Sequence, residues 1–200
     1  AFSSVAHMGF VMLGISTLTP FGMNAAMFGM VAHGLITGML FFVAGSVKER
    51  YHTLEIKRLS GMLKQMPRLG WILGFCAMAS LGLPGLAGFW GEFPAILSAY
   101  KPAAGLPEET FRTFMVVAAL GTVLAAGYLL WLYQRTAFGE INPEFAPGHG
   151  HDDDIHDVNK FEWVAWTPLL VAIVVFGVYP QLMFKVLDPA VSATLKAFGG

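Results

Sequence analysis

Charged residues are scarce in this 200-residue chain, and the first 47 positions contain no Asp, Glu, Lys or Arg. These four residue types make up 12% of the sequence, about half their share in a typical soluble domain. The formal net charge is only -1, so there is no excess of positive charge to bind nucleic acid. Hydrophobic residues make up 56%, and the mean hydropathy is +0.61. The composition therefore indicates a membrane protein.

Cysteine occurs only once, as Cys76. A single thiol cannot close a disulfide within the chain or supply the thiolates of an iron–sulfur cluster. We therefore expect the chain to bind no cofactor, with any redox chemistry taking place elsewhere. The chain also begins at Ala1 without an initiator Met and without a secretory signal pattern. We expect a C-terminal fragment of a longer protein.

Long apolar segments define the predicted fold. A helix needs about 20 apolar residues to cross a bilayer, and the sequence predicts an all-α, polytopic transmembrane bundle with about five such helices in one membrane domain. The third segment is too long for a straight crossing, and Pro84 with Gly85 interrupts it, so we expect a broken helix. The predicted spans are about 1–18, 23–47, 70–100, 113–133 and 163–184, with a tail at 185–200.

Glu92 is the most informative residue within these spans. It is the only Asp, Glu, Lys or Arg between Arg68 and Lys101. An unpaired acid at the middle of a bilayer costs roughly 2.5 kcal/mol or more, so intramembrane carboxyl groups usually have a function. A purely structural role is the alternative, and it predicts that Glu92→Gln changes nothing. A buried acid in a broken apolar helix favours ion transport.

Two histidines, His7 and His33, lie in the uncharged opening region. Histidine titrates near neutral pH and can donate from one ring nitrogen while it accepts at the other. Together with Glu92, the two imidazoles could form a proton wire. Our hypothesis is Grotthuss transfer from His7 through water to His33 and on to Glu92. Each histidine could instead simply bond a neighbouring helix.

The connection from Phe138 to Lys160 contains the sequence GHGHDDDIHD. Imidazole and carboxylate groups both bind divalent cations, so a metal site is conceivable there. The connection is long and carries several Gly and Pro residues, which is typical of a solvated loop. We therefore assign no metal ligands. The residues concerned are His149, His151, Asp152, Asp153, Asp154, His156 and Asp157.

Five segments carry a resemblance to a known family: AFSSVAHMGF, MVAHGLITGMLFFVAG, ERYHTLEIKRLSGM, SLGLPGLAGFWGEF and GVYPQ. In this order and spacing they resemble the C-terminal part of the chain M family, the antiporter-like, proton-translocating membrane subunits of NADH:quinone oxidoreductase, respiratory complex I. The resemblance covers most of the chain. It is weakest in the loop from Phe138 to Lys160 and after Leu187.

The resemblance implies a subunit of about fourteen helices with two inverted five-helix repeats, of which this chain would supply the last five helices. It implies that His7 and His33 are the central relay histidines and that Glu92 is the terminal carboxyl group. Sister subunits usually carry a lysine at the Glu92 position, so the acid favours chain M.

The resemblance also implies partners and a location. The partners would be other membrane subunits of complex I, especially neighbouring antiporter-like chains, together with the lipid bilayer, protons and water. The location would be the bacterial inner membrane, with multiple crossings, and the enzyme would be a translocase whose redox centres lie in other subunits.

Three alternatives remain open at this point. A sodium/proton antiporter subunit or a membrane-bound hydrogenase subunit would share the fold. A divalent-metal transporter would use the histidine loop and Glu92, but none of His7, His33 and Glu92 has an Asp, Glu or His three or four residues further along.

Overall fold

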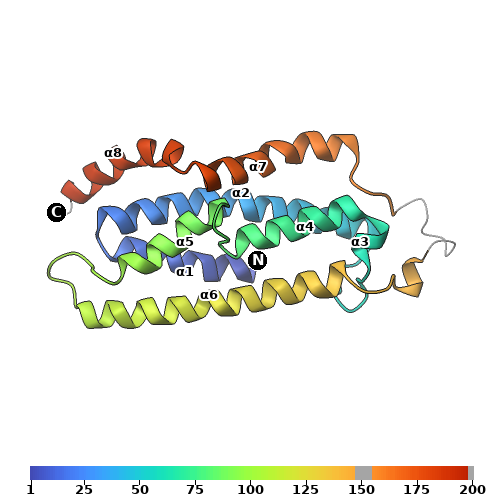
Figure 1. The fold of residues 1–200 in the computed structure, drawn as a ribbon, viewed down its shortest axis with the longest axis horizontal. Coiled ribbons are helices and arrows are strands. Elements are labelled where there is room, and N and C mark those ends of the chain that lie inside the picture. The colour runs from blue at the N-terminus through green and yellow to red at the C-terminus, as the bar shows by residue number, and fades with distance from the viewer. Residues whose placement is uncertain (147–154, 198–200) are drawn as a thin grey trace.

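The computed structural model describes residues 1–146 and 155–197, and every regular element in this part of the chain is helical. The helices run along the long axis of an elongated bundle (Figure 1). The all-α prediction is confirmed. The elements are α1 (Phe2–Ser16), α2 (Pro20–Tyr51), α3 (Met62–Gln65), α4 (Pro67–Ser80), α5 (Ala87–Ser98), α6 (Glu108–Ala137), the 3-10 turn η1 (Pro143–Phe145), α7 (Lys160–Val178) and α8 (Gln181–Ala197).

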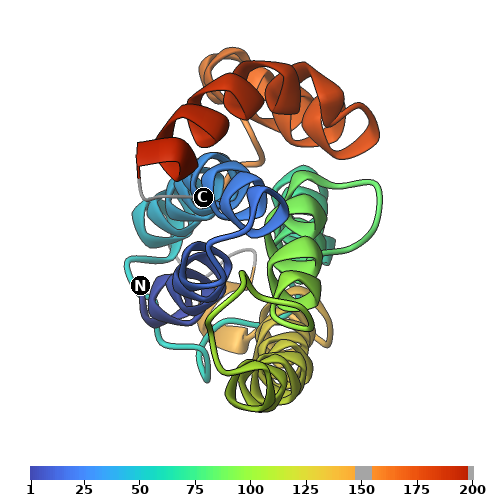
Figure 2. The same cartoon turned by 90° about the vertical axis from the view of Figure 1, so that its left-hand side faces the viewer.

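Helix α2 is the axis of the bundle, and its ends follow from its sequence. Thr19 caps the first turn by accepting a hydrogen bond from the Gly22 amide, and Pro20 fits the first helical position. The helix ends where His52 adopts a left-handed conformation. Along its length α2 packs against α1, α4, α5, α7 and α8. The end-on view shows α7 and α8 as one outer layer, α6 on the opposite side, and the remaining long helices between them (Figure 2).

The predicted broken helix is present as α4 and α5, which lie nearly end to end (Figure 1). Pro84 cannot donate a backbone hydrogen bond, so the helical ladder stops before it. Gly82 and Gly85 then take positive φ angles of 73° and 93°, a region that favours glycine. The interruption at Pro84 and Gly85 is therefore confirmed, and it leaves two short helices, α4 and α5, in place of one long one.

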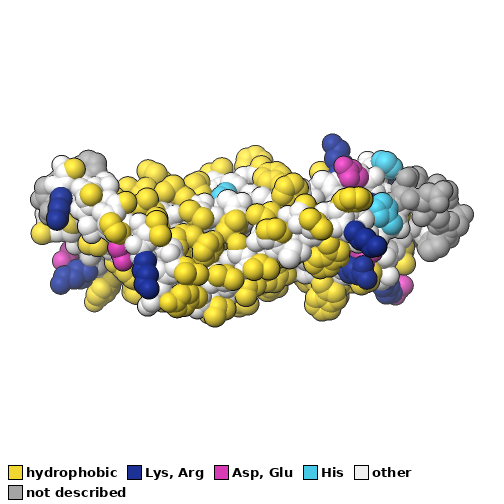
Figure 3. All heavy atoms as spheres, turned by 90° about the horizontal axis from the view of Figure 1, so that it is seen from above, with side chains coloured by type: hydrophobic (Ala, Val, Ile, Leu, Met, Phe, Trp, Pro, Cys, Tyr) yellow, Lys and Arg dark blue, Asp and Glu magenta, His cyan; other side chains and the backbone are white. Residues whose placement is uncertain are grey.

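Three helices in the described part of the chain, α2, α6 and α7, are long and apolar enough to cross a membrane, and α1 is a shorter apolar helix. Helix α7 ends at Val178, earlier than the predicted limit at residue 184, because Pro180 cannot continue it. On the face shown in Figure 3, Lys and Arg side chains gather toward both ends and hydrophobic side chains cover the middle. This distribution fits a protein embedded in a bilayer.

Helices α2 and α5 come unusually close at Gly29 and Gly91. A Cβ atom added to Gly91 would lie only 2.4 Å from the Cα atom of Gly29. Any side chain at this position would push the two backbones apart, because the obstacle is main chain rather than a flexible side chain. Glycine at position 91 is therefore required for the spacing of α2 and α5.

We expect Gly91→Ala to destabilise the full-length protein by about 1–3 kcal/mol, the usual cost of overpacking a well-filled interior. Thermal unfolding in detergent measures the effect as a lower midpoint. Gly38→Ala is the matched control, because a Cβ atom there meets nothing within 4 Å and alanine favours helix. Equal midpoints for the two variants would show that the crossing tolerates a side chain.

A buried ion pair joins the end of α2 to the start of α7. Arg50 is 3% exposed, and its Nη1 and Nη2 atoms donate to Oε1 and Oε2 of Glu162 at 3.0 Å and 2.8 Å. Ser46 also donates to Glu162. The Glu162 carboxylate further accepts from the Asn159 amide, which completes a capping box at the start of α7. This cluster fixes the position of α7 on α2.

Removing one partner of a buried pair leaves the other charge uncompensated, at a cost of about 3–5 kcal/mol. We therefore expect Arg50→Ala to lower the unfolding midpoint of the full-length protein by several degrees. Arg58→Ala is the control, because the Arg58–Glu144 pair is about 42% exposed on each side and such pairs contribute under about 1 kcal/mol. Similar midpoints for both variants would contradict a stabilising role for the Arg50 pair.

Candidate functional site

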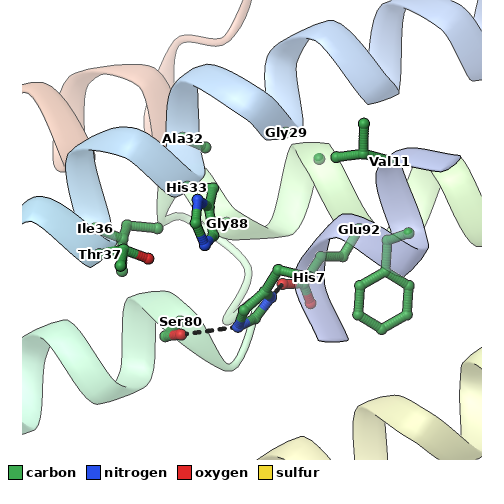
Figure 4. Close-up of a pocket in the computed structure, with 12 residues that line it drawn as sticks. His7, Val11, Gly29, Ala32, His33, Ile36, Thr37, Ser80, Gly88 and Glu92 are labelled. Carbon is green, nitrogen blue, oxygen red and sulfur yellow. Dashed lines mark hydrogen bonds and ion pairs between the residues drawn. The ribbon is translucent and has the colours of Figure 1, made fainter. Parts of the chain in front are cut away.

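The structure brings the three titratable residues singled out from the sequence to one place between α1, α2 and α5 (Figure 4). His7 on α1 and Glu92 on α5 are in direct contact, with 2.7 Å between Nδ1 of the imidazole and Oε1 of the carboxyl group. Their side chains are only 8% and 13% exposed. A buried acid and an imidazole from distant parts of the chain therefore share one hydrogen bond.

Glu92 is positioned by glycines on two sides. Its neighbour Gly91 allows α5 to lie against α2, as described above. On the other side the carboxyl group faces the helix break, where a Cβ atom on Gly82 would come within 2.9 Å of Oε2 of Glu92. The break therefore provides the room that the carboxyl group occupies.

The second nitrogen of His7 faces the end of α4. Its Nε2 atom lies 3.1 Å from the hydroxyl oxygen of Ser80, the last residue of that helix. Ser80 is 4% exposed. Sequence reasoning missed Ser80, although a polar residue just before the LGLPG break of an apolar span was an available signal. His7 therefore bridges the two halves of the broken helix.

His33 lies beside His7 but does not occupy the place predicted for it. Its Nε2 atom is 3.1 Å from the hydroxyl oxygen of Ser4, and the two imidazole rings are 5.7 Å apart between centroids. We expected the order His7, His33, Glu92, whereas in the structure His7 is the residue that contacts Glu92. Ser4 and His7 are three residues apart on α1, so one helix face presents the hydroxyl to α2 and the imidazole to α5.

A small cavity of about 20 Å³ joins these groups. One water molecule needs roughly 10–15 Å³ of such space and a few polar partners, so the cavity fits about one water between the imidazoles. Among the described residues that line it, only three are titratable: the two histidines and Glu92. The other lining residues are Phe10, Val11, Gly29, Ala32, Ile36, Thr37, Ser80, Gly88 and Gly91.

These contacts suit proton transfer. An imidazole can hold a proton on either nitrogen, and the Nδ1–Oε1 separation is that of a strong, charge-assisted hydrogen bond. An imidazolium at His7 can therefore pass its Nδ1 proton to an ionised Glu92 without movement of the helices and keep its other proton on Nε2. Serine hydroxyls at both Nε2 atoms can donate or accept, whichever the imidazole requires.

In the described part of the chain, no three His, Cys, Asp or Glu side chains gather as a group that could hold a metal ion. Asp157 accepts hydrogen bonds from the backbone amides of Arg68 and Leu69, so it caps the start of α4. His149, His151 and the three aspartates at 152–154 lie outside the described residues.

The first 106 residues match the family described as NADH:quinone oxidoreductase/Mrp antiporter, TM. This match covers more than half of the chain. The chain belongs to this family. It is a multi-pass membrane protein of the antiporter-like type, as the resemblance implied.

Curated relatives agree with this assignment. The chain is 37% identical to NADH-quinone oxidoreductase subunit M of Rickettsia felis. The alignment runs over 199 residues and includes 99% of this chain. The chain is also 37% identical to subunit M of Rhodobacter capsulatus over 96% of its length, and 38% identical to an NAD(P)H-quinone oxidoreductase chain 4 of Synechococcus over 98%. The chain spans 37%, 35% and 37% of the length of these relatives.

Two solved structures share the fold. A chain of respiratory complex I from Thermus thermophilus with bound NADH superposes with a TM-score of 0.83 and 32% identity, over all of this chain and 39% of that chain. A chain of the Mrp complex from Dietzia gives a TM-score of 0.78 at 21% identity, over 96% of this chain and 41% of that chain. The second likeness shows the fold alone.

Proposed function

We propose that this chain is part of a proton-translocating membrane subunit of NADH:quinone oxidoreductase, and that His7, His33 and Glu92 relay protons through it. The observation that carries the proposal is the 2.7 Å hydrogen bond between His7 and Glu92, buried at a helix break in a region otherwise free of charge. The redox chemistry would belong to other subunits of the complex, and the neighbouring partners would be antiporter-like chains in the bacterial inner membrane.

The geometry favours one order for the proposed relay. A proton on His33 lies close to His7, because the two ring centroids are 5.7 Å apart and both rings line the small cavity. From His7 the proton moves along the Nδ1–Oε1 bond to Glu92. Glu92 is the acid among the titratable groups that line the cavity, so in this proposal the proton is released from it. This order replaces the predicted sequence of His7, then His33, then Glu92.

A sodium/proton antiporter subunit is the second candidate, because the matching family includes Mrp antiporters and a chain of an Mrp complex has the same fold. The two functions differ in ion dependence. A relay within NADH:quinone oxidoreductase pumps protons in sodium-free medium during NADH oxidation, whereas an antiporter needs a sodium gradient. Sodium-dependent proton movement that persists without electron transfer would favour the antiporter.

We expect Glu92→Gln in the full-length protein to abolish proton pumping and to leave the complex assembled. The amide keeps the shape and a hydrogen bond to His7, but it cannot take up a proton. Pumping is measured with a pH-sensitive dye in inverted membrane vesicles during NADH oxidation. Glu108→Gln is the control, because Glu108 forms an exposed pair with Arg112 on α6. Wild-type pumping by Glu92→Gln would reject the relay.

The revised order predicts that His7→Ala is more damaging than His33→Ala. Of the two histidines, His7 is the one hydrogen-bonded to Glu92, so its loss breaks the relay at the acid, while water can partly replace His33 beside the cavity. The same vesicle assay should show almost no pumping for His7→Ala and a severe but partial loss for His33→Ala. A ratio of pumped protons to electrons that is unchanged in His33→Ala would remove His33 from the relay.

A further inference from the structure

The hydroxyl group of Ser80 is the partner that the structure gives to the outer nitrogen of His7, at 3.1 Å from Nε2. Both groups are buried. Ser80 ends α4, so its backbone is held by the helix while its side chain is directed at the imidazole, as the close-up shows (Figure 4). Three groups are therefore arranged in a row: the Ser80 hydroxyl, the His7 ring and the Glu92 carboxyl.

The protonation of the His7–Glu92 pair determines whether the Ser80 hydroxyl donates to Nε2 or accepts from it. When Glu92 is ionised and His7 is neutral, Nδ1 carries the proton toward the carboxylate and Nε2 is an acceptor, so Ser80 must donate. When the pair has taken up a second proton, Nε2 carries a proton from which Ser80 must accept a hydrogen bond, including when the other proton lies on Glu92 and the acid donates to Nδ1. An imidazolium also requires Ser80 to accept, because both of its nitrogens are donors.

We propose that Ser80 is a positioning residue that acts as a switch for the protonation state of His7. Its hydroxyl group donates to Nε2 when the His7–Glu92 pair holds one proton, and it rotates to accept from Nε2 when the pair holds two. This inference deepens the proposed function and rests on it. The transfer starts from the His7 imidazolium, whose second proton comes from His33 across the cavity in the proposed relay. It breaks the N–H bond at Nδ1, forms an O–H bond at Oε1 and leaves neutral His7 with its proton on Nε2. Ser80 keeps its own proton throughout.

The end of α4 provides what the rotation requires. When Ser80 accepts from Nε2, its own proton needs another acceptor, and the carbonyl oxygen of Cys76 lies one turn earlier in the same helix. Serine in a helix commonly donates to the carbonyl four residues before it. The titratable groups that line the cavity around His7 are His33 from α2 and Glu92 from α5. No lining group other than Ser80 competes for Nε2 in the described hydrogen bonds.

Loss of the hydroxyl affects the two states unequally. An unpaired N–H on a buried imidazolium costs more than an unpaired acceptor on a neutral imidazole, because hydrogen bonds of charged groups are worth more than those of neutral ones. Ser80→Ala therefore disfavours the forms with a proton on Nε2, by about tenfold. A tenfold change corresponds to one pH unit, so more acidic conditions are needed to populate the same forms.

The experiment is the pH profile of proton pumping by the full-length protein in its membrane complex, from about pH 5.5 to 8.5 in vesicles, normalised to electron transfer. Ser80→Ala is expected to displace the profile toward lower pH by about one unit. Ser80→Thr keeps the hydroxyl group and is expected to restore the wild-type profile. Ser98→Ala is the matched control, because this buried serine on α5 donates only to the Ala95 carbonyl of its own helix.

A Ser80→Ala profile that coincides with that of Ser98→Ala would overturn the proposal. So would a loss of pumping at every pH that Ser80→Thr does not restore, because that result indicates a structural role. If Ser80→Ala does not assemble, Ser80→Cys is judged by the same displacement, since its thiol is similar in size and bonds weakly. Normal pumping by Glu92→Gln would refute the relay itself, whereas an inactive Glu92→Gln with an unshifted Ser80→Ala would refute only the switch.

Discussion

The site depends on one constraint: an acid held within an apolar bundle needs a partner that can balance its charge. Glu92 meets this need with the imidazole of His7 at 2.7 Å, and other features of the fold serve that contact. The glycine crossing of α2 and α5 brings Glu92 into position, and the turn at Gly82 leaves room for its carboxyl group. Because the pair is nearly dry, a proton can be shared across it with little reorganisation of solvent.

The helix break has a chemical consequence as well as a geometric one. In a continuous helix through residues 70–100, the backbone groups would bond to one another within the helix. Such a helix would present an apolar surface to His7. The interruption at Pro84 ends α4 at Ser80 and starts α5 at Ala87, so a hydroxyl group and a carboxyl group approach the same imidazole from two directions. Irregular backbone at membrane depth is tolerated where it packs against protein, and here α7 approaches the break so closely that a Cβ atom on Gly177 would lie 2.2 Å from the carbonyl oxygen of Gly85.

Local features of the sequence predicted the all-helical membrane fold and the break at Pro84, and they singled out His7, His33 and Glu92, because hydropathy, proline chemistry and isolated charge are local properties. The order of the relay was not predictable in this way. His7 and Glu92 are 85 residues apart, and which histidine reaches the acid depends on how far α1 is rotated against α5. The same reason hides Ser80 and the Arg50–Glu162 pair, since each becomes significant only through a partner on another helix.

The spacing of the three titratable groups also bears on the energy of transport. Moving one proton against about 150 mV requires roughly 3.5 kcal/mol, at about 2.3 kcal/mol per 100 mV. A charged His33 stands 5.7 Å from His7 between ring centroids, and two unit charges about 6 Å apart at an effective dielectric near 20 repel by about 2.8 kcal/mol. In the proposed relay, moving the His7 proton onto Glu92 would relieve this repulsion but would also remove the attraction between a charged His33 and the Glu92 carboxylate, which lines the same cavity. The net contribution of His33 is therefore smaller than the repulsion alone, and most of the work of transport would have to come from further charges or from a drier path.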